Sequence, residues 1–268
     1  MVPRSFRKYI EDTGIKVIAT GDSGQLPPVS DAPAYLVDGK IYHLAQLMRQ
    51  AESSPLIYLA HRARRGLPIE CGLYGKDALV IFDDEVDNEL IAKSNIVLCG
   101  TNKTRDSIND RVRYQLLNKF NDFPEYGERL ICRKNDWTKT IQGISLANGL
   151  VGTVVKPPEI GTYNGKELVL DFLPDLLSVP FVDLKISHQY LNSSYQEREK
   201  LKKSPYIQGD LMEYAYAITV HLSQGSEYNC GIYFEENLGS NLQNNLNYTA
   251  ITRFKHQIVY AVPRLRYH

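Results

Sequence analysis

The sequence predicts a mixed α/β protein, with a parallel sheet flanked by helices and a small antiparallel β-barrel inserted into it. Two observations predict this fold. Short β-branched apolar runs alternate with helix-like segments near both ends of the chain, which is typical of a parallel sheet. Across residues 126–209 the sequence pattern changes to short strand-like runs separated by glycines and prolines, which indicates an antiparallel barrel.

Composition excludes several classes of protein. The 268 residues carry 31 basic and 31 acidic side chains, so the net charge is zero, and 43% hydrophobic content argues against wholesale disorder. A net charge of zero gives no overall electrostatic attraction to nucleic acid. It is still compatible with a local basic groove. No apolar run approaches the roughly 18–20 residues of a membrane span, and the start resembles no secretory signal, so we expect a cytoplasmic protein without a membrane partner.

The four cysteines are scattered and have no spacing typical of a zinc site, so we expect buried thiols in a reducing compartment and no metal site. They are Cys71, Cys99, Cys132 and Cys230.

The first elements follow from local patterns. Lys16–Thr20 is an apolar β-branched run that ends in Gly21 and Asp22, which predicts a buried strand leading into a loop. Ser54 followed by proline predicts a helix start, and Gly66 predicts its end. The apolar face of this helix has helical spacing and comprises Leu56, Leu59, Ala60 and Ala63.

The next segments continue the alternation of strand and helix. Ala78–Phe82 and Asn95–Cys99 are predicted strands, and Lys103–Asn118 is a predicted helix. One face of that helix is expected to carry the apolar residues Ile108, Val112, Leu116 and Leu117.

The sequence pattern of the inserted region predicts several strands with no helix between them. These strands are Glu128–Arg133, Leu150–Val155, Glu167–Phe172 and Pro180–Ser187. Residues 190–210 are polar, rich in tyrosine and locally basic, and we interpret them as a loop or hairpin that returns to the α/β part.

From residue 214 to the end of the chain, strand-like and helix-like patterns alternate again. The predicted elements are a strand over Tyr214–Val220, a loop over His221–Glu227, a strand over Gly231–Phe234, a helix over Asn244–Phe254 and a strand over Gln257–Val262.

Two loops carry side chains suited to phosphate chemistry. The run GDSGQLPPV, residues 21–29, follows a predicted strand, and loops at the carboxyl ends of strands are where α/β sheets bind ligands. The amide of Gln25 can sense a phosphate or its attacking water. Arg49, in LMRQ, offers a planar guanidinium for a terminal phosphate. Taken alone, an ordinary turn and a surface arginine explain these residues better.

Two further motifs lie near the end of the chain. AYAITVHLSQGSE, residues 215–227, is a strand entering a small polar turn in which Ser223 and Ser226 can hold a nucleic-acid phosphate. Glu227 can accept hydrogen bonds from a ribose or an arginine. The alternative interpretation of His221 is a structural histidine hydrogen-bonded within the core. YTAITR, residues 248–253, places Arg253 at the end of a predicted helix, as an arginine finger or a surface ion pair.

In this order and spacing, the four motifs resemble motifs III, IV, V and VI of superfamily-one DNA helicases of the RecD-like and Dda-like branch. The runs GERLICRKNDW and NGLVGTV resemble the entry into the SH3-like barrel inserted in the second RecA-like domain of that branch. The resemblance covers essentially the whole chain. It implies residues 1–45 as the remnant of a first RecA-like domain, 46–125 with 210–268 as the second, and 126–209 as the inserted SH3-like barrel and hairpin.

The resemblance also implies roles for individual residues in an ATP-hydrolysing motor that moves 5′ to 3′ along single-stranded DNA. Gln25, Arg49 and Arg253 would be the catalytic phosphate contacts. The ATP-binding and coupling residues would be Gly21, Asp22, Gln224, Gly225 and Glu227, and the DNA contacts would be Thr101, Asn102, His221 and Ser223. Leu222 departs from the family's usual lysine, so that phosphate contact would either be missing or be supplied by Lys202 or Lys203 instead.

The phosphate-binding motif G-x-x-x-x-G-K-[ST] is absent from the 268 residues, and so is an Asp-Glu pair at a strand end for Mg²⁺. The chain looks like the family's sequence from just after that pair onward. We therefore expect the C-terminal part of a helicase that cannot hydrolyse ATP alone, with ATP and Mg²⁺ as cofactors only of the complete enzyme.

Several alternatives stay open on the sequence. One alternative is a non-catalytic module that binds single-stranded nucleic acid. Another is one half of a split helicase, which would pair with an N-terminal half or associate with itself through residues 1–45. An RNA-directed relative is a further alternative. Candidate basic contacts, each equally well explained as solvated surface, are Arg62, Arg64, Arg65, Arg198, Lys200, Lys202 and Lys203.

Overall fold

The computed structural model describes residues 7–27, 42, 54–159, 165–239 and 242–264. It consists of two compact units, one formed by Met1–Val86 with Gln224–His268 and the other by Asp87–Ser223. Among the described residues, no helix is both long and apolar enough to cross a membrane.

The first unit contains a sheet with the strand order β1-β2-β13-β12. Strands β2 (Ala78–Phe82), β13 (Phe254–Val262) and β12 (Tyr228–Phe234) run parallel to one another, and β1 (Gly72–Tyr74) pairs antiparallel with β2. A short 3-10 helix, η2 (Asp83–Glu85), follows β2. The predicted parallel strands of this region are confirmed.

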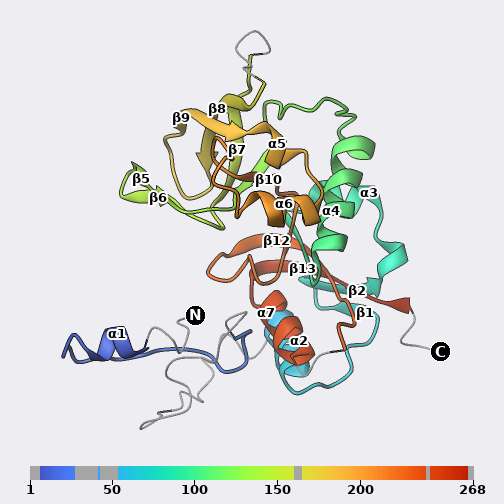
Figure 1. Ribbon diagram of the computed structural model, residues 1–268. Coiled ribbons are helices and arrows are strands. Elements are labelled where there is room, and N and C mark those ends of the chain that lie inside the picture. The colour runs from blue at the N-terminus through green and yellow to red at the C-terminus, as the bar shows by residue number, and fades with distance from the viewer. Residues whose placement is uncertain (1–6, 28–41, 43–53, 160–164, 240–241, 265–268) are drawn as a thin grey trace. The chain divides into compact units, whose positions relative to one another are not determined.

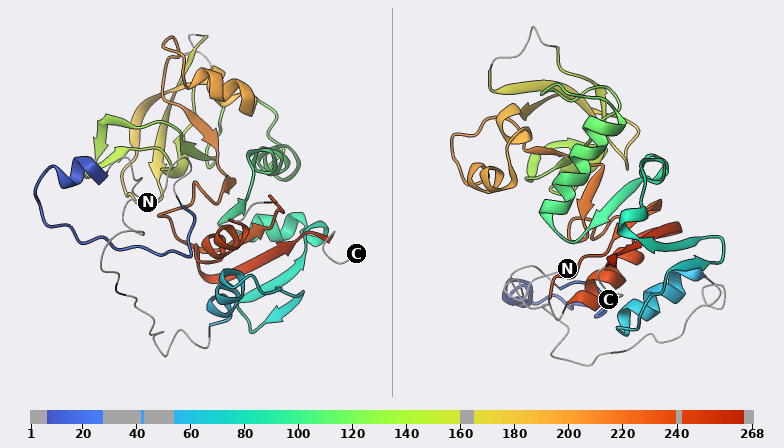
Figure 2. Two further views of the ribbon diagram at one scale, coloured as in Figure 1. Left: turned by 60° about the horizontal axis from the view of Figure 1, so that its bottom comes forward. Right: turned by 90° about the vertical axis from the view of Figure 1, so that its right-hand side faces the viewer.

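Helices α2 (Pro55–Arg64) and α7 (Gln243–Ile251) pack against each other and against β13 (Figures 1 and 2). Helix α2 follows Ser54 with proline in its first turn, and Gly66 adopts φ +66° just beyond its end, as predicted. Its buried residues are the four that the helical spacing predicted, Leu56, Leu59, Ala60 and Ala63.

The buried strand predicted for Lys16–Thr20 is wrong. Residues 15–22 form no strand, and Ile18 is 92% exposed. A strand needs a neighbouring strand to pair its backbone groups, and none of the described residues pairs with this segment. A short helix that the sequence did not predict, α1 (Arg7–Glu11), precedes it.

In the second unit, β3 (Ile96–Cys99) and β11 (Ala217–Thr219) form a fully buried parallel pair. Helix α4 (Asn102–Asp110) packs on both strands, and α3 (Asn88–Lys93) precedes β3. The predicted strand at Asn95–Cys99 is thus confirmed. The predicted strand over Tyr214–Val220 is instead divided between β11 and a strand of another sheet, because Ala215 and Tyr216 interrupt it.

The predicted helix over Lys103–Asn118 changes its winding midway. Helix α4 passes into a π-helix, η3 (Arg111–Leu116), in which the Leu117 amide donates to the carbonyl oxygen of Val112, five residues earlier, at 3.0 Å. This winding rotates the following side chains away from the expected face. Leu117, expected on the apolar face, is therefore 42% exposed.

A five-stranded antiparallel sheet forms most of the inserted region, in the order β10-β4-β7-β8-β9. Its strands are β4 (Arg129–Cys132), β7 (Val151–Lys156), β8 (Glu167–Pro174), β9 (Phe181–Ser187) and β10 (Met212–Tyr214). The four predicted strands of the insertion are confirmed. Their alternate side chains form an apolar core that includes Leu130, Val154, Leu168, Phe172, Leu184 and Met212.

The strand pairings of the described residues do not close a barrel, since β10 and β9 are the two ends of the order. The ends do approach each other at one isolated bridge, Ile186 with Asp210. There the Asp210 amide donates to Lys185 at 2.7 Å, and the Ser187 amide donates to Asp210 at 2.9 Å. The SH3-like barrel is therefore not confirmed as a closed barrel.

The loop or hairpin predicted for residues 190–210 is wrong in its first half, while residues 202–210 contain no helix or strand. Two short helices, α5 (His188–Leu191) and α6 (Tyr195–Leu201), occupy its first half. Ser194 and Glu197 form a capping box at the start of α6, in which the Ser194 amide donates to the Glu197 carboxylate at 3.0 Å. The S-x-x-E spacing was a helix signal in the sequence.

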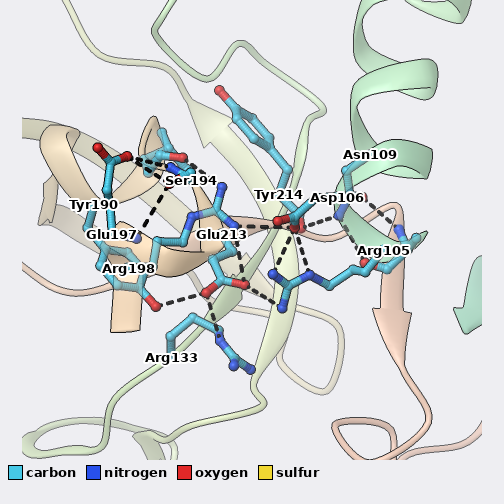
Figure 3. A network of polar contacts seen from close by, with 12 residues as sticks. Arg105, Asp106, Asn109, Arg133, Tyr190, Ser194, Glu197, Arg198, Glu213 and Tyr214 are labelled. Atoms are coloured by element: carbon cyan, nitrogen blue, oxygen red, sulfur yellow. Dashed lines mark hydrogen bonds and ion pairs between the residues drawn. The ribbon is translucent and has the colours of Figure 1, made fainter. Parts of the chain in front are cut away.

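A buried carboxylate joins the elements of the second unit. Glu213 on β10, whose side chain is 2% exposed, pairs with Arg105 at 2.9 Å, Arg133 at 3.1 Å and Arg198 at 3.8 Å (Figure 3). The hydroxyl of Tyr190 donates to it at 2.8 Å. Burial raises the pKa of Glu213, but the three arginines outweigh burial and lower it.

Replacing Glu213 by alanine should destabilise the protein by about 3–5 kcal/mol, because buried guanidinium groups are left without their counter-charge. Glu199→Ala is the matched control, since Glu199 pairs with Lys202 at the surface, where such pairs contribute about 0–1 kcal/mol. Urea unfolding of both variants checks this, and equal losses of stability would contradict it. Because the pKa is lowered on folding, the stabilisation is complete above about pH 4.3 and is lost as the pH falls below that value.

Candidate functional site

In the first unit, the loop that carries Gln25 is a compact turn. The Gly24 amide donates to the Asp22 carboxylate at 2.8 Å, and the Gln25 amide donates to the Asp22 carbonyl oxygen at 3.1 Å. An aspartate at the start of such a turn satisfies the backbone groups that no strand or helix would pair. Within the described residues, the side-chain amide of Gln25 has no hydrogen-bond partner.

Helix α7 holds this turn through its polar face. The Asn245 side chain lies 2.9–3.1 Å from the carbonyl oxygens of residues 23–25, as their hydrogen-bond donor. One turn later, the Thr249 hydroxyl accepts from the amide of Leu26 at 2.9 Å, and Leu26 itself is 1% exposed. The backbone of the loop is therefore positioned from one face of one helix.

A tyrosine and an arginine complete the contact. The Tyr248 hydroxyl donates to Asp22 at 2.6 Å, and burial together with that carboxylate raises the pKa of Tyr248 to about 12. The Arg64 guanidinium, from α2, lies 5.5 Å from the centre of the Tyr248 ring and 3.8 Å from Asp22. The phenol thus stays protonated at neutral pH and remains a donor to the loop.

Glycine is required at position 24 but not at position 21. A Cβ at Gly24 would lie 2.9 Å from the Tyr248 ring and 3.0 Å from the Arg64 side chain, whereas nothing lies within 4 Å of a Cβ at Gly21. The close approach of the loop to α7 therefore explains Gly24, and Gly21 has no such requirement.

Gln224, which belongs to the first unit, also contacts this loop. The Gln224 side-chain amide donates to the Leu26 carbonyl oxygen at 2.9 Å. Gly225 follows with φ +90°, a conformation that favours glycine. The exposed Glu227 pairs with Lys255 at 2.7 Å, and this bond lowers the pKa of Glu227. Glu227 therefore has a lysine partner in the structure.

Arg253 is buried without an ion pair among the described residues, although Glu227 and Asp22 act on it at longer range. Its side chain, 8% exposed, donates to the carbonyl oxygens of Thr249 and Ser226 at 3.2 Å each and to the hydroxyl of Thr252 at 3.3 Å. Burial lowers its pKa, and no carboxylate among the described residues lies within ion-pair distance. A buried cation with only neutral partners fits an anionic ligand such as a phosphate.

Arg49, the further predicted phosphate contact, lies outside the described residues. No group of three or more His, Cys, Asp or Glu side chains in the described part of the chain is arranged to hold a metal ion.

In the second unit, the predicted DNA contacts gather at the carboxyl ends of two neighbouring strands. Cys99 pairs with Thr219 in the parallel β3–β11 register, and the Val220 amide donates to Cys99 at 2.9 Å. Residues 101–102 and 221–223 follow these ends directly. Thr101 also caps α4, since its hydroxyl accepts from the Thr104 amide at 3.2 Å.

These predicted DNA contacts differ in their exposure to solvent. Ser223, expected beside the DNA, is instead fully buried, and its hydroxyl donates to the Val220 carbonyl oxygen at 2.8 Å, so it stabilises the turn. His221 is half-buried, and burial lowers its pKa, so the imidazole is neutral at pH 7. Thr101 and Asn102 are also partly exposed.

Sequence reasoning missed the residues that hold the Gln25 loop. Asn245, Tyr248 and Thr249 lie at i, i+3 and i+4, so they share one face of α7, and Arg64 adds to them from α2. Their spacing was visible in the sequence. Their partner was not, because Asp22 lies 226 residues away from Tyr248 along the chain.

Two sequence comparisons bear on this arrangement. Residues 214–259 match the family model of the UvrD-like helicase C-terminal domain. The chain is 25% identical over 265 residues to the ATP-dependent RecD2 DNA helicase of Deinococcus radiodurans, and the match covers 90% of this chain and 32% of that protein. The chain thus spans about a third of the length of this relative. The resemblance to the C-terminal portion of superfamily-one helicases of the RecD-like type is confirmed.

Solved structures of Pif1 helicases are also similar. The match to Pif1 from Candida albicans has a TM-score of 0.49 at 16% identity and covers 98% of this chain and 70% of that one. Pif1 from Bacteroides, in complex with ADP-AlF3 and single-stranded DNA, matches with a TM-score of 0.43 at 16% identity, over 77% of this chain and 48% of that one. Because both scores lie below 0.5, the resemblance rests on the two sequence matches.

Asn245→Ala should release the Gln25 loop from α7. Each lost hydrogen bond contributes about 0.5–1.5 kcal/mol, so the amides of Gln25 and Leu26 should exchange with solvent roughly 5- to 100-fold faster. Asn244→Ala is the control on the same helix, since the exposed Asn244 side chain makes no hydrogen bond within the described residues. Amide hydrogen exchange measures both variants, and unchanged exchange in Asn245→Ala would show that the helix does not hold the loop.

Proposed function

We propose that the chain supplies the C-terminal part of an ATP-dependent superfamily-one DNA helicase that moves 5′ to 3′ and works in the cytoplasm. One observation carries this proposal. The Gln25 loop, the Gln224 turn and the helix that precedes Arg253 are joined by direct hydrogen bonds, and these are the segments that resemble motifs III, V and VI. Such contacts give a route by which one motif senses the state of another.

The residues around Arg253 fit a phosphate group of ATP. Arg253 would bind the terminal phosphate as an arginine finger, and Arg49 would be a second finger by its place in the motif. Gln25 would use its unengaged side-chain amide to contact the phosphate or its water, with Gly21, Asp22, Gly225 and Glu227 shaping the surrounding loops. ATP with Mg²⁺ supplies the phosphoryl group in the complete enzyme.

The nucleic acid would bind at the carboxyl ends of β3 and β11. Asn102 and the first amides of α4, with Thr101 and His221, offer donors to a backbone phosphate. Such contacts carry no base code, so binding would be independent of sequence. The domain assignment implied by the resemblance, with 1–45 in a first RecA-like domain, 46–125 and 210–268 in a second and 126–209 as an SH3-like insertion, is part of this proposal.

The second candidate is a protein that binds single-stranded nucleic acid without hydrolysing ATP, or one half of a split helicase. The observation that favours it is the absence of a G-x-x-x-x-G-K-[ST] motif from the 268 residues. In the split form, the partner would be an N-terminal half that carries this motif, or the chains would associate through residues 1–45.

The purified chain should bind single-stranded DNA but show only background ATP hydrolysis, because it lacks the phosphate-binding loop. Binding should weaken as salt rises, with a slope of about −0.7 for each phosphate contact. Fluorescence anisotropy with a labelled oligonucleotide and a phosphate-release assay measure the two properties. Robust ATP turnover by the chain alone would contradict the fragment proposal, and absence of DNA binding would contradict both candidates.

The DNA sequence upstream of Met1 separates the helicase from the binding module. A phosphate-binding motif and a terminal Asp-Glu pair, in frame or in a neighbouring gene, would favour the helicase. Parallel titrations with DNA and RNA oligonucleotides of one sequence would show which nucleic acid the site prefers.

A further inference from the structure

A two-stranded hairpin of the second unit stands apart from the five-stranded sheet. Strands β5 (Asp136–Ile141) and β6 (Ile144–Leu146) pair only with each other and extend away from that sheet (Figure 1). Gln142 and Gly143 join them with φ values of 51° and 77°, as expected for a type I′ turn. Leu146 is fully buried in the core, so the base of the hairpin is firmly held.

A large bulge interrupts the pairing of this hairpin. Asp136 pairs with Leu146, but the next pair is Thr140 with Ser145, so residues 137–139 have no partners on β6. Bulges of this kind redirect side chains and are frequent next to functional sites.

The bulge presents Trp137, the single tryptophan of the chain, to solvent. Its side chain is 68% exposed, although tryptophan is usually among the most extensively buried residue types. The Asp136 carboxylate holds the bulge, accepting from the amide and the hydroxyl of Thr138 at 2.9 and 2.6 Å. These bonds lower the pKa of Asp136 to about 2. The exposure of the ring is therefore built into the local structure.

The hairpin leads directly to the turn that follows β11. Asn135, two residues before Trp137, accepts from the Asn148 amide at 2.7 Å through its side-chain oxygen. A Cβ on the next residue, Gly149, would lie 3.9 Å from the backbone oxygen of Leu222. The segment carrying Trp137 is thus connected, through the 148–149 turn, to the loop that holds His221.

The surroundings of the ring are polar and locally basic. Residues 133–148 contain three basic side chains and one acidic one. Lys139 is engaged by Asp136 at 3.0 Å and Asp210 at 2.6 Å, whereas Lys134 is exposed and has no ion pair within the described residues. An isolated ring among polar side chains is unlike the apolar patch of a protein-binding surface, and it matches the pairing of aromatic and basic groups that binds single strands.

We propose that Trp137 stacks on a base of single-stranded nucleic acid that continues from the His221 turn past Asn148 and Gly149. This inference rests on the proposed binding of nucleic acid and adds a contact to the bases themselves. Lys134 would bind the adjacent backbone phosphate. Every base has a π-face, so the contact would tolerate any sequence.

The single tryptophan makes the stacking directly measurable. Addition of an unlabelled oligo-dT to the full chain should quench the tryptophan emission along the same saturation curve as the anisotropy of a labelled oligo-dT. An oligonucleotide of abasic sugar-phosphate units should raise the anisotropy at low salt but leave the emission unchanged.

Trp137→Ala should weaken oligo-dT binding roughly 5- to 100-fold, the range for loss of one stacked base, and should leave binding of the abasic strand unchanged. Trp137→Phe should restore most of the affinity, because it keeps an aromatic face. Tyr206→Ala is the matched control, since Tyr206 is 88% exposed in the same unit and should have no effect.

The outcomes separate this inference from the function on which it rests. DNA binding with unchanged tryptophan emission, and equal affinity in Trp137→Ala, would overturn the stacking contact while leaving the proposed function intact. No anisotropy change in the wild-type chain would overturn both. Equal losses for the dT and abasic strands would show that Trp137 supports the fold of the hairpin instead of a base contact.

Discussion

The second unit depends on one buried carboxylate. Glu213 is almost fully enclosed, and an ionised carboxylate is tolerated there only because three guanidinium groups surround it. Those groups come from α4, the end of β4 and α6, while Glu213 itself lies on β10. Three of these four elements adjoin segments of the proposed nucleic-acid site, since α4 begins beside Thr101, β4 leads to the Trp137 hairpin and β10 leads to β11. The network of Figure 3 therefore connects α4, β4 and β10 through one carboxylate.

An apolar cluster would stabilise the same elements at lower electrostatic cost, but it would tolerate small shifts between them. Ion pairs with fixed donor and acceptor geometry are satisfied in fewer arrangements. Removing one partner from such a network leaves a buried charge uncompensated, so the elements that it joins depend on one another.

Local patterns predicted the fold wherever a segment's own side chains decide its structure. The buried face of α2 and the strands β2, β3 and β8 follow from spacing alone. The failures share another cause. Lys16–Thr20 has strand-like residues but no described neighbour to pair with, and Leu117 turns outward because the helix changes its winding before it. For the candidate site, the motifs identified Gln25 and Arg253, while the Asn245 contact depends on tertiary proximity that no local pattern encodes.

The buried arginines of the described residues differ in the charge of the groups that contact them. Arg105 and Arg113 are 1% and 3% exposed, and each pairs with a buried carboxylate, Glu213 and Glu128, at 2.9 Å. Arg253 is buried almost as deeply, yet only neutral oxygens contact it. A cation in that setting lowers the stability of the folded chain unless a ligand supplies the missing negative charge. An anionic ligand would relieve this electrostatic cost, and Arg253 lies on the chain where the sequence resemblance implies a phosphate contact.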